Sequence, residues 1–470
     1  MLWTGLDRLG TCVIQFVIEI LIARVLLPSD YGLIGMLAIF MIIAQTFIDS
    51  GFLNALIQKK DRNLNDYSTV FYFSIIVASV IYLILYFSAP FIADFYHQPV
   101  LCKVARVYLL TLIINSFSIT QTAKLTIDLN FKVQAITSIL SIIISGSIGI
   151  YLAYNGFGVW ALVWQGITAA FVRTITIWIA SRWKPLLVFS KESFDRLFSF
   201  GSKLLASSLI NNVYNKISTL IIGKAFHATE LGFFTRAQQF CQLPTQTITN
   251  IVIKVNYPIL AELQDNDEKL VESYKILLRT PIFILYPLLF GMSVLATPMI
   301  QVILGEIWVP AANLIPILCF GCLWDPLSSI NLNLLYVKGQ TNLVLKLEFI
   351  KKPIAFTLLF CSIPFGLNGI CCAIALYNFI AFAFNCYYTG KILDFGFFKQ
   401  VKAILPIFIY SIIMSILVYA STFVLDMPMS KLLVGISVGV ISYFIISLLS
   451  RDSSLFQILR LIKLRKSNEI

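Results

Sequence analysis

The chain is divided into long stretches that contain no charged residue. Lys132 and Arg173 enclose one such stretch, and Lys352 and Lys391 enclose another; each is interrupted only by a short glycine-containing segment. A helix that crosses the hydrocarbon core of a bilayer needs about 20 apolar residues. Each stretch is therefore long enough for two spanning helices joined by a tight turn. This pattern predicts a protein that crosses a membrane many times.

The composition supports the same conclusion. Of the 470 residues, 59% are hydrophobic and only 12% are charged, whereas about a quarter of the residues are charged in a soluble domain. The predicted fold class is an all-α polytopic membrane protein with about 14 transmembrane helices and no sizeable soluble domain. The expected helices lie near residues 4–27, 31–55, 68–89, 103–123, 134–154, 158–180, 197–223, 230–255, 280–303, 310–336, 344–364, 368–388, 403–422 and 431–450.

Basic residues predict the orientation. Lys59, Lys60 and Arg62 follow the second expected helix, and Arg460 and Lys463 lie in the tail after the last one. Lys and Arg accumulate in cytoplasmic loops, so we expect both termini in the cytoplasm and no nucleic-acid partner despite the net charge of +12. The first apolar run is expected to remain as a helix and not to be removed as a signal peptide.

A segment of the sequence is repeated at an offset of 200 residues. Residues 21–24 followed by 29–33 match residues 221–224 followed by 229–233. In both copies a cation ends one helix, and a Ser or Thr cap with an acid in the first turn begins the next. A joint match in cation, cap, acid and glycine predicts an internal repeat.

The repeat predicts the domain organisation. Residues 1–190 form an N-lobe with helices 1–6, and residues 191–390 form a C-lobe with helices 7–12, around a central cavity. Residues 391–470 then hold two extra C-terminal helices, 13 and 14, and a basic cytoplasmic tail.

Polar residues form stripes on corresponding helices of the two lobes. Asp7, Thr11, Gln15 and Glu19 recur every fourth residue in the first helix, and Lys203, Ser207, Asn211 and Asn215 do so in the seventh. A charge in the middle of a bilayer costs about 2.5–3.5 kcal/mol or more, so these faces must contact protein or water. They predict a hydrated cavity. For each single residue, hydrogen bonding between helices remains an alternative.

Sequence signatures of enzymes are absent. No glycine-rich run ends in Gly-Lys-Ser or Gly-Lys-Thr, so the sequence lacks a phosphate-binding loop for ATP. His97 and His227 are isolated near expected helix ends, and the cysteines lie in apolar runs without metal-ligand partners. We therefore expect a transporter without ATPase activity, metal or cofactor.

Several motifs carry a resemblance to a known family. They are Leu21–Gly32, Asp49–Phe52 with Ala55–Lys60, Phe198–Lys203, Leu231–Gln239 and Tyr388–Lys391. With these motifs the sequence resembles the polysaccharide-export flippases of the multidrug/oligosaccharidyl-lipid/polysaccharide superfamily, specifically the colanic-acid-exporter-like lipopolysaccharide biosynthesis proteins. The resemblance extends over nearly the entire chain.

The resemblance implies a function. Such a flippase moves an undecaprenyl-pyrophosphate-linked oligosaccharide, a repeat unit of O-antigen, capsule or exopolysaccharide, across the bacterial inner membrane by alternating access. Its partners would be this polyprenyl-pyrophosphate-linked glycan, the lipid bilayer and a glycan polymerase, and we expect a monomer.

An anionic pyrophosphate needs a cationic, water-filled cavity, which selects candidate residues. The candidates for binding the anion are Lys203, Lys216, Arg236, Lys351, Lys352, Arg8 and Arg24. The candidates for the polar lining are Gln15, Ser207, Asn211, Asn215 and Gln239.

Without ATPase machinery, the carrier would use an ion gradient or consumption of its product. An intramembrane carboxylate is the natural group to take up a cation or a proton. Glu19 lies well within the first helix, and Asp325 lies beside Pro326 in the middle of the tenth. These two are the candidates for ion coupling, although either could simply neutralise a neighbouring lysine.

Two other functions remain open on the sequence alone. A cation-coupled drug or small-molecule antiporter of the same fold would require acids to dominate the cavity, but basic residues are at least as numerous in the expected helices. An O-antigen polymerase or ligase would require a large outer loop with catalytic residues, and the largest expected outer loop covers only about residues 89–102.

Overall fold

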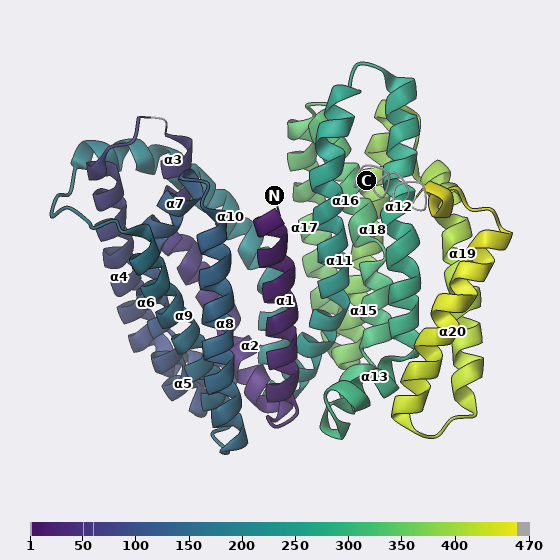
Figure 1. The fold of residues 1–470 in the computed structure, drawn as a ribbon, viewed down its shortest axis with the longest axis horizontal. Helices are drawn as coiled ribbons and strands as arrows, with labels where there is room; N and C mark the ends of the chain where they lie inside the picture. Colours follow the sequence, from purple (N-terminus) through teal and green to yellow (C-terminus); the bar gives the residue numbers. More distant parts are fainter. Residues whose placement is uncertain (1, 50, 60, 458–470) are drawn as a thin grey trace, which may run out of the picture. The chain divides into compact units, whose positions relative to one another are not determined.

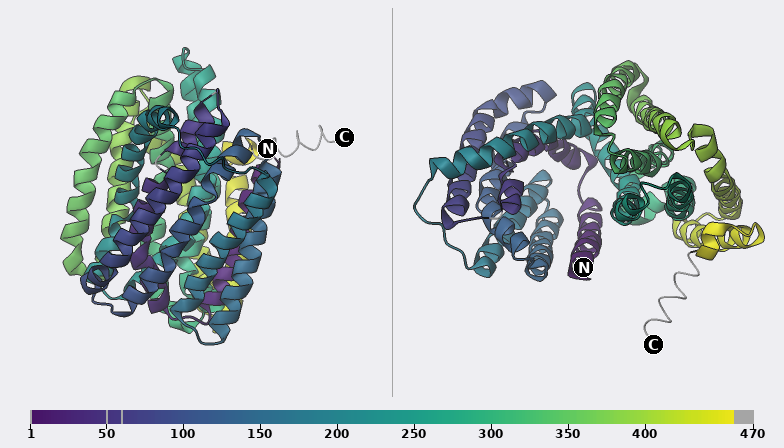
Figure 2. Two further views of the ribbon diagram at one scale, coloured as in Figure 1. Left: turned by 90° about the vertical axis from the view of Figure 1, so that its left-hand side faces the viewer. Right: turned by 90° about the horizontal axis from the view of Figure 1, so that it is seen from above.

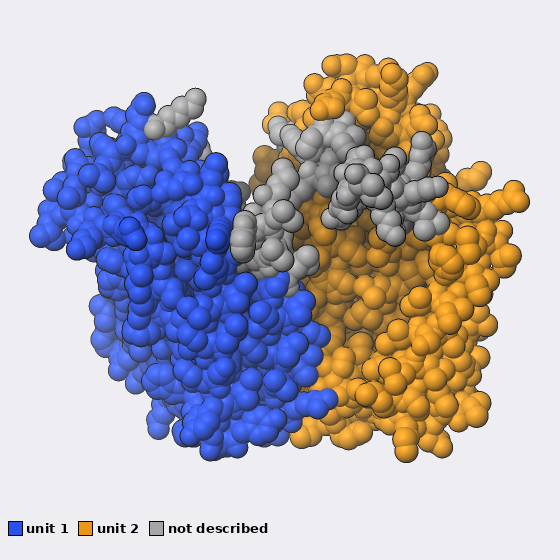
Figure 3. Space-filling view, viewed as in Figure 1, with its two compact units in different colours: residues 1–232 blue, residues 233–470 orange. Residues whose placement is uncertain are grey.

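The protein is all-α throughout the part that the computed structural model describes, which is residues 2–49, 51–59 and 61–457. Some side chains are outside this description, namely those of residues 2–9, 200, 203, 207, 210, 211, 214, 215, 254–259 and 341. The chain divides into two compact units, residues 1–232 and residues 233–470 (Figure 3).

The first unit is a layered bundle of long helices (Figure 1). Its contacts join α1 to α8, α8 to α9, and α2 to α10, and the short helices α5, α6 and α7 pack against α4 and α9. The helices are α1 (Leu2–Ala23), α2 (Pro28–Asp49), α3 (Phe52–Gln58), α4 (Leu64–Tyr96), α5 (Val100–Tyr108), α6 (Leu110–Ser116), α7 (Ile119–Ile127), α8 (Phe131–Tyr154), α9 (Val159–Ser181) and α10 (Lys191–Ala225).

The second unit has the same kind of architecture, and the view along the helix axes in Figure 2 shows its helices running side by side. The helix α18 packs on α15, α16 and α17, while α12 packs on α15 and α19, and α19 packs on α20. The helices are α11 (Ala228–Glu262), whose residues up to Gly232 belong to the first unit, α12 (Asp267–Val294), α13 (Ala296–Ile303), α14 (Val309–Ala312), α15 (Ile315–Cys322), α16 (Asp325–Val337), α17 (Thr341–Ser362), α18 (Gly366–Leu393), α19 (Phe397–Phe423) and α20 (Pro428–Leu449), with 3₁₀ turns at Glu306–Trp308 and Ile363–Phe365.

The polytopic all-α fold that the sequence predicts is confirmed. Among the described residues, ten helical stretches are long and apolar enough to cross a membrane, and one of them, Asn342–Leu393, contains both α17 and α18. The helices α10 and α11 are not among these stretches, because many polar residues interrupt their apolar runs. The count of fourteen spans remains a prediction.

Helix ends differ from the predicted ones for a local reason. Several helices begin before their apolar run, directly after a residue that caps the N-terminus. Asn63 forms a capping box with Asp66 at the start of α4, and the side chains of Ser190 and Asn266 cap α10 and α12. Hydropathy marks the membrane, whereas caps mark where the helix begins.

Four predicted helices are interrupted. The expected helix at 31–55 is divided into α2 and α3, the one at 103–123 into α5, α6 and α7, the one at 280–303 into α12 and α13, and the one at 310–336 into α14, α15 and α16. The break between α15 and α16 ends at Asp325 and Pro326, because a proline at the first turn has no N–H to donate to a preceding turn.

The repeat at an offset of 200 residues leads to a reciprocal contact inside the first unit. A Cβ atom on Gly32 would lie 1.7 Å from the carbonyl oxygen of Ala228, and one on Gly232 would lie 1.9 Å from that of Pro28. Each glycine therefore touches the backbone at the start of the other copy's helix, and only glycine fits there. The division between the units falls directly after Gly232; the lobe boundary at residue 190 and the superposition of the lobes remain predictions.

Candidate functional site

Two lysines and one glutamate form an ionic cluster on α17. Lys351 Nζ lies 2.6 Å from Glu348 Oε1, and Lys352 Nζ lies 3.2 Å from Glu348 Oε2. The three residues are neighbours because positions three and four apart lie on one face of a helix. Lys351 is only 2% exposed, whereas Glu348 and Lys352 are half-buried. Two cations share one carboxylate, so these three side chains together carry a net charge of about +1 when all are ionised.

An asparagine on the next helix holds the buried lysine. Lys351 Nζ donates to Asn385 Oδ1 over 3.3 Å, and Asn385 Nδ2 donates to the hydroxyl and the carbonyl oxygen of Ser328 over 2.7 and 3.2 Å. Asn385 is fully buried. The side chain thus connects α17, α18 and α16 around the ammonium group.

A second set of buried polar contacts joins α16, α18 and α19. Asn331 on α16 and Gln400 on α19 exchange two amide hydrogen bonds of 2.9 and 3.0 Å, and Cys386 donates to Gln400 Oε1 over 3.1 Å. All three residues are buried. Buried amides with satisfied partners fix how helices pack, so α16, α18 and α19 are held in one arrangement.

Sequence reasoning missed Asn385, although a signal was present. Asn378 and Asn385 are seven residues apart in an otherwise apolar stretch, which puts both on one face of α18. Asn378 donates to the carbonyl oxygen of Gly321 over 3.3 Å. Two amides on one face of an apolar helix indicate a face that packs against other polar groups.

The other predicted cations on α11 and α10 have different surroundings. Arg236 is buried, and its guanidinium donates to the half-buried Gln239 over 2.5 Å. Lys216 on α10 is half-buried. The structure therefore brings Arg236 and Gln239 together, as two residues of the predicted anion site and polar lining.

Part of the predicted site lies outside the described side chains. This applies to Lys203, Ser207, Asn211, Asn215 and Arg8. A described neighbour, Asn212, donates to Thr46 Oγ1 on α2 over 2.9 Å. At least one polar residue of α10 outside the predicted stripe therefore serves packing within the first unit.

The remaining candidates lie at three places. Gln15 is exposed on α1, and its amide donates to Glu19 Oε1 over 2.9 Å. Arg24 is exposed directly after the end of α1. Asp325 is half-buried in the first residue of α16, at the break after α15. The two coupling candidates thus differ: Glu19 is in a continuous helix and Asp325 is at an interrupted one.

The comparison with protein families gives a match over most of the chain. The model of a family described as polysaccharide biosynthesis protein matches residues 21–313. The chain belongs to this polysaccharide biosynthesis protein family.

Curated members of similar sequence support the assignment. The chain is 26% identical to the teichuronic acid biosynthesis protein TuaB of Bacillus subtilis, over 73% of this chain and 71% of that one. It is 24% identical to the succinoglycan biosynthesis transport protein ExoT of Rhizobium meliloti, over 66% of this chain and 63% of that one.

A solved structure shows which fold this family member has. The structure of the lipid II flippase MurJ in an inward closed conformation superposes with a TM-score of 0.78, at 15% identity, over 96% of this chain and 99% of that one. At this identity the likeness establishes the fold. The chain is therefore a multi-pass membrane protein with the fold of a flippase.

Proposed function

We propose that this protein moves a lipid-linked glycan precursor across the bacterial inner membrane by alternating access, with both termini in the cytoplasm. The observation that carries the proposal is the buried cluster of Lys351, Lys352 and Glu348 within a membrane-spanning helix. Membership of a polysaccharide biosynthesis family and the fold of a lipid II flippase support it.

The cluster is suited to a polyprenyl pyrophosphate. Burying a charge is expensive unless it is paired, and two ammonium groups that share one carboxylate within a membrane helix attract a further anion. Glu348 contacts both ammonium groups. A pyrophosphate with several acceptor oxygens can replace this carboxylate and bind the two lysines together.

Asn385 keeps Lys351 in position for this exchange. A lysine side chain has many rotamers, and fixing it costs conformational entropy. The hydrogen bond from Lys351 to Asn385, which is itself anchored to Ser328, already orders the ammonium group. Binding of the anion then costs less conformational entropy, because the ammonium group of Lys351 is already ordered.

The other candidates are part of the same proposal. Arg236, Lys216 and Lys203, and more distantly Arg8 and Arg24, would bind the anion at other stages of the transport cycle. Gln15, Ser207, Asn211, Asn215 and Gln239 would line the polar path. Glu19 or Asp325 would carry ion coupling, and a glycan polymerase would receive the product.

A genetic experiment tests the proposal. Deleting the gene should remove the surface glycan and leave lipid-linked repeat units on the inner leaflet. Restoring the gene with Lys351→Gln and Lys352→Gln combined should give the same defect, whereas Lys346→Gln, an exposed position on the same helix, should restore export. Full export by the double variant at normal membrane abundance would contradict the assigned site.

The same strains distinguish the drug antiporter. If the protein expels cationic drugs, its deletion lowers the drug concentration that stops growth and leaves the glycan intact. We expect the opposite result: glycan loss with unchanged drug sensitivity.

A further inference from the structure

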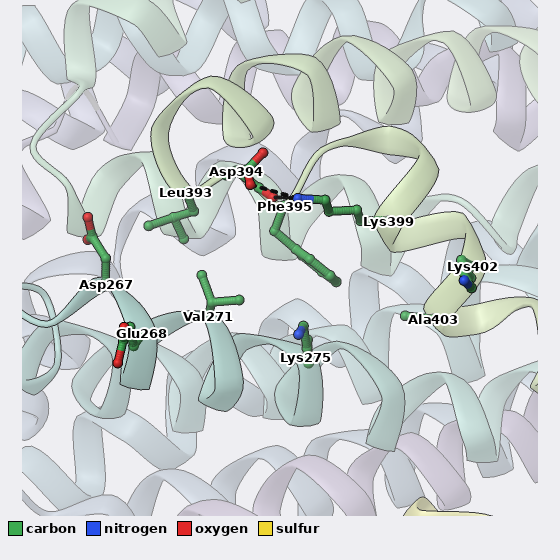
Figure 4. A pocket seen from close by; sticks show the side chains of 10 residues that line it. All are labelled: Asp267, Glu268, Val271, Lys275, Leu393, Asp394, Phe395, Lys399, Lys402 and Ala403. Carbon is green, nitrogen blue, oxygen red and sulfur yellow. Dashed lines mark hydrogen bonds and ion pairs between the residues drawn. The ribbon is translucent and has the colours of Figure 1, made fainter.

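A pocket with a volume of about 740 Å³ lies in the second unit, away from the cluster on α17. Its walls are the first turns of α12 and the corner between α18 and α19, as Figure 4 shows. The side chains that line it include Glu268, Val271 and Lys275 on α12 and Lys402 on α19.

Some of the charges around this pocket are neutralised by protein partners. Asp267 Oδ1 lies 2.7 Å from Lys338 Nζ, and Asp394 Oδ2 lies 2.7 Å from Lys399 Nζ. Within the described part of the chain, Glu268, Lys275 and Lys402 form no ion pair. One carboxylate and two ammonium groups are therefore available to a ligand.

The available charges are separated by sign. Figure 4 shows Glu268 at one end of the pocket, beside Asp267, and Lys275 and Lys402 toward the other end. Glu268, Val271 and Lys275 are at positions i, i+3 and i+7, so they share one face of α12. Seven residues of helix rise by about 10 Å. A small group with an anion at one end and a cation at the other can bridge this distance between two flexible side chains.

The location points to a lipid. Three candidate membrane spans begin or end at this pocket, at Asp267, Leu393 and Phe397. The charged residues of the pocket lie just outside the apolar runs of α18 and α19 and before the apolar run of α12, which begins near residue 280, so the pocket is on the headgroup side of these spans. Lys275 also lies 5.2 Å from the centre of the Phe395 ring, and a cation beside an aromatic ring is common at this level.

An apolar stripe continues from the pocket along the membrane. Lys402 is followed on the same face of α19 by Leu405, Ile409 and Ile416, which are 45%, 44% and 61% exposed. Acyl chains could lie against this stripe while their headgroup reaches the pocket. A soluble phosphate compound has no acyl chain that could contact this apolar stripe.

We propose that this pocket binds a phospholipid whose headgroup contains both a phosphate and a primary amine. The phosphate contacts Lys275 and Lys402, and the ammonium group donates to Glu268. The quaternary amine of phosphatidylcholine has no N–H to donate, and phosphatidylglycerol has no amine, so the site selects phosphatidylethanolamine. The site is separate from the proposed substrate cluster and does not depend on which glycan is carried.

Native mass spectrometry of the purified full-length protein tests this proposal. The protein is incubated with phosphatidylethanolamine, phosphatidylcholine or phosphatidylglycerol of identical acyl chains. We expect phosphatidylethanolamine to be retained about fivefold more than either other lipid, as one charge-assisted contact provides. Glu268→Gln should lower the retention of phosphatidylethanolamine to that of phosphatidylglycerol. The double variant Lys275→Gln, Lys402→Gln should lower the retention of both of these lipids.

Matched controls lie on the same helix. Glu272→Gln and Lys269→Gln remove exposed charges of α12 that do not line the pocket, and they should leave the preference unchanged. Equal retention of the three lipids, or an unchanged preference in Glu268→Gln, would overturn the proposal. Displacement of the lipid by free phosphoethanolamine at equal concentration would show a site for a soluble compound and would overturn the assignment to a lipid.

Discussion

A buried ionic cluster in the first unit and one in the second differ in their balance of charge. In the first unit, Lys59 Nζ lies 2.5 Å from Asp66 Oδ2, and Asp66 is fully buried. This pair contains one cation and one carboxylate. In the second unit, Lys351 and Lys352 share Glu348. The first cluster is neutral, whereas in the second the cations outnumber the carboxylate.

The hydrogen bonds around the Lys59–Asp66 pair also indicate a structural role. Asp66 and Asn63 form a reciprocal capping box at the start of α4, with bonds of 2.8 and 3.0 Å. Arg62 adds a bond to the carbonyl oxygen of Lys59. The Lys59–Asp66 pair thus closes a loop and stabilises a helix end. We therefore expect the balanced Lys59–Asp66 pair to be structural and the Lys351–Lys352–Glu348 cluster, with its excess of positive charge, to be open to an anion.

The largest effect should come from breaking the balanced pair. Asp66→Ala removes one of the two hydrogen bonds of the capping box, the one that the Asn63 N–H donates to Asp66, and leaves Lys59 without its carboxylate, which should lower the free energy of unfolding by about 3 kcal/mol. Thermal unfolding in detergent would show this loss. Flipping per folded molecule should stay normal; a specific loss of flipping without loss of stability would assign Asp66 to transport.

A second large effect is expected at Arg236. Arg236→Ala removes a buried cation and its hydrogen bond to Gln239, so export should fall by about tenfold or more, the equivalent of 1.4 kcal/mol. The measurement is surface glycan per molecule in the membrane. Arg236→Lys, which retains the charge, should recover part of the loss; if it recovers none while folding is normal, the charge is not the property that matters.

Asn385→Leu should have a smaller effect on the cluster of α17. It leaves Lys351 paired with Glu348 but removes its neutral partner, which costs about 1–2 kcal/mol in ordering the ammonium group. We expect flipping to fall a few-fold at near-normal abundance. Asn378→Leu on the same helix face is the matched control and should leave flipping unchanged.

The smallest effect should have the opposite sign. Glu348→Gln removes the internal anion that competes for Lys351 and Lys352, so binding of a polyprenyl pyrophosphate should become a few-fold tighter. Isothermal titration at two salt concentrations measures it, and the gain should shrink at high salt. Weaker binding in this variant would show that Glu348 supports the site and does not compete for it.

The class of fold could be predicted from the sequence because a helix that crosses a bilayer must be apolar over about 20 residues, and such stretches are visible in the sequence. Sequence reasoning also predicted the cations of α17 and Arg236 as candidates, since charges in apolar helices are few. It missed Asn385, although the spacing of Asn378 and Asn385 was visible, because the partners of Asn385 are distant in sequence. It could not find the capping role of Asp66, because this role depends on where a helix begins. The contact of Gly32 with Ala228 was likewise hidden, although the repeat contained both positions.

We propose that Lys351 and Lys352 bind the pyrophosphate of the carried lipid. This binding can be tested by reconstituted flipping of a fluorescent polyprenyl-pyrophosphate-linked oligosaccharide, with the wild type, the Lys351→Gln, Lys352→Gln double variant and Lys346→Gln in matched vesicles. We predict that the wild type and Lys346→Gln flip the lipid at equal rates and that the double variant is slower by about 100-fold, equivalent to roughly 3 kcal/mol. Equal rates for all three folded proteins would contradict the claim.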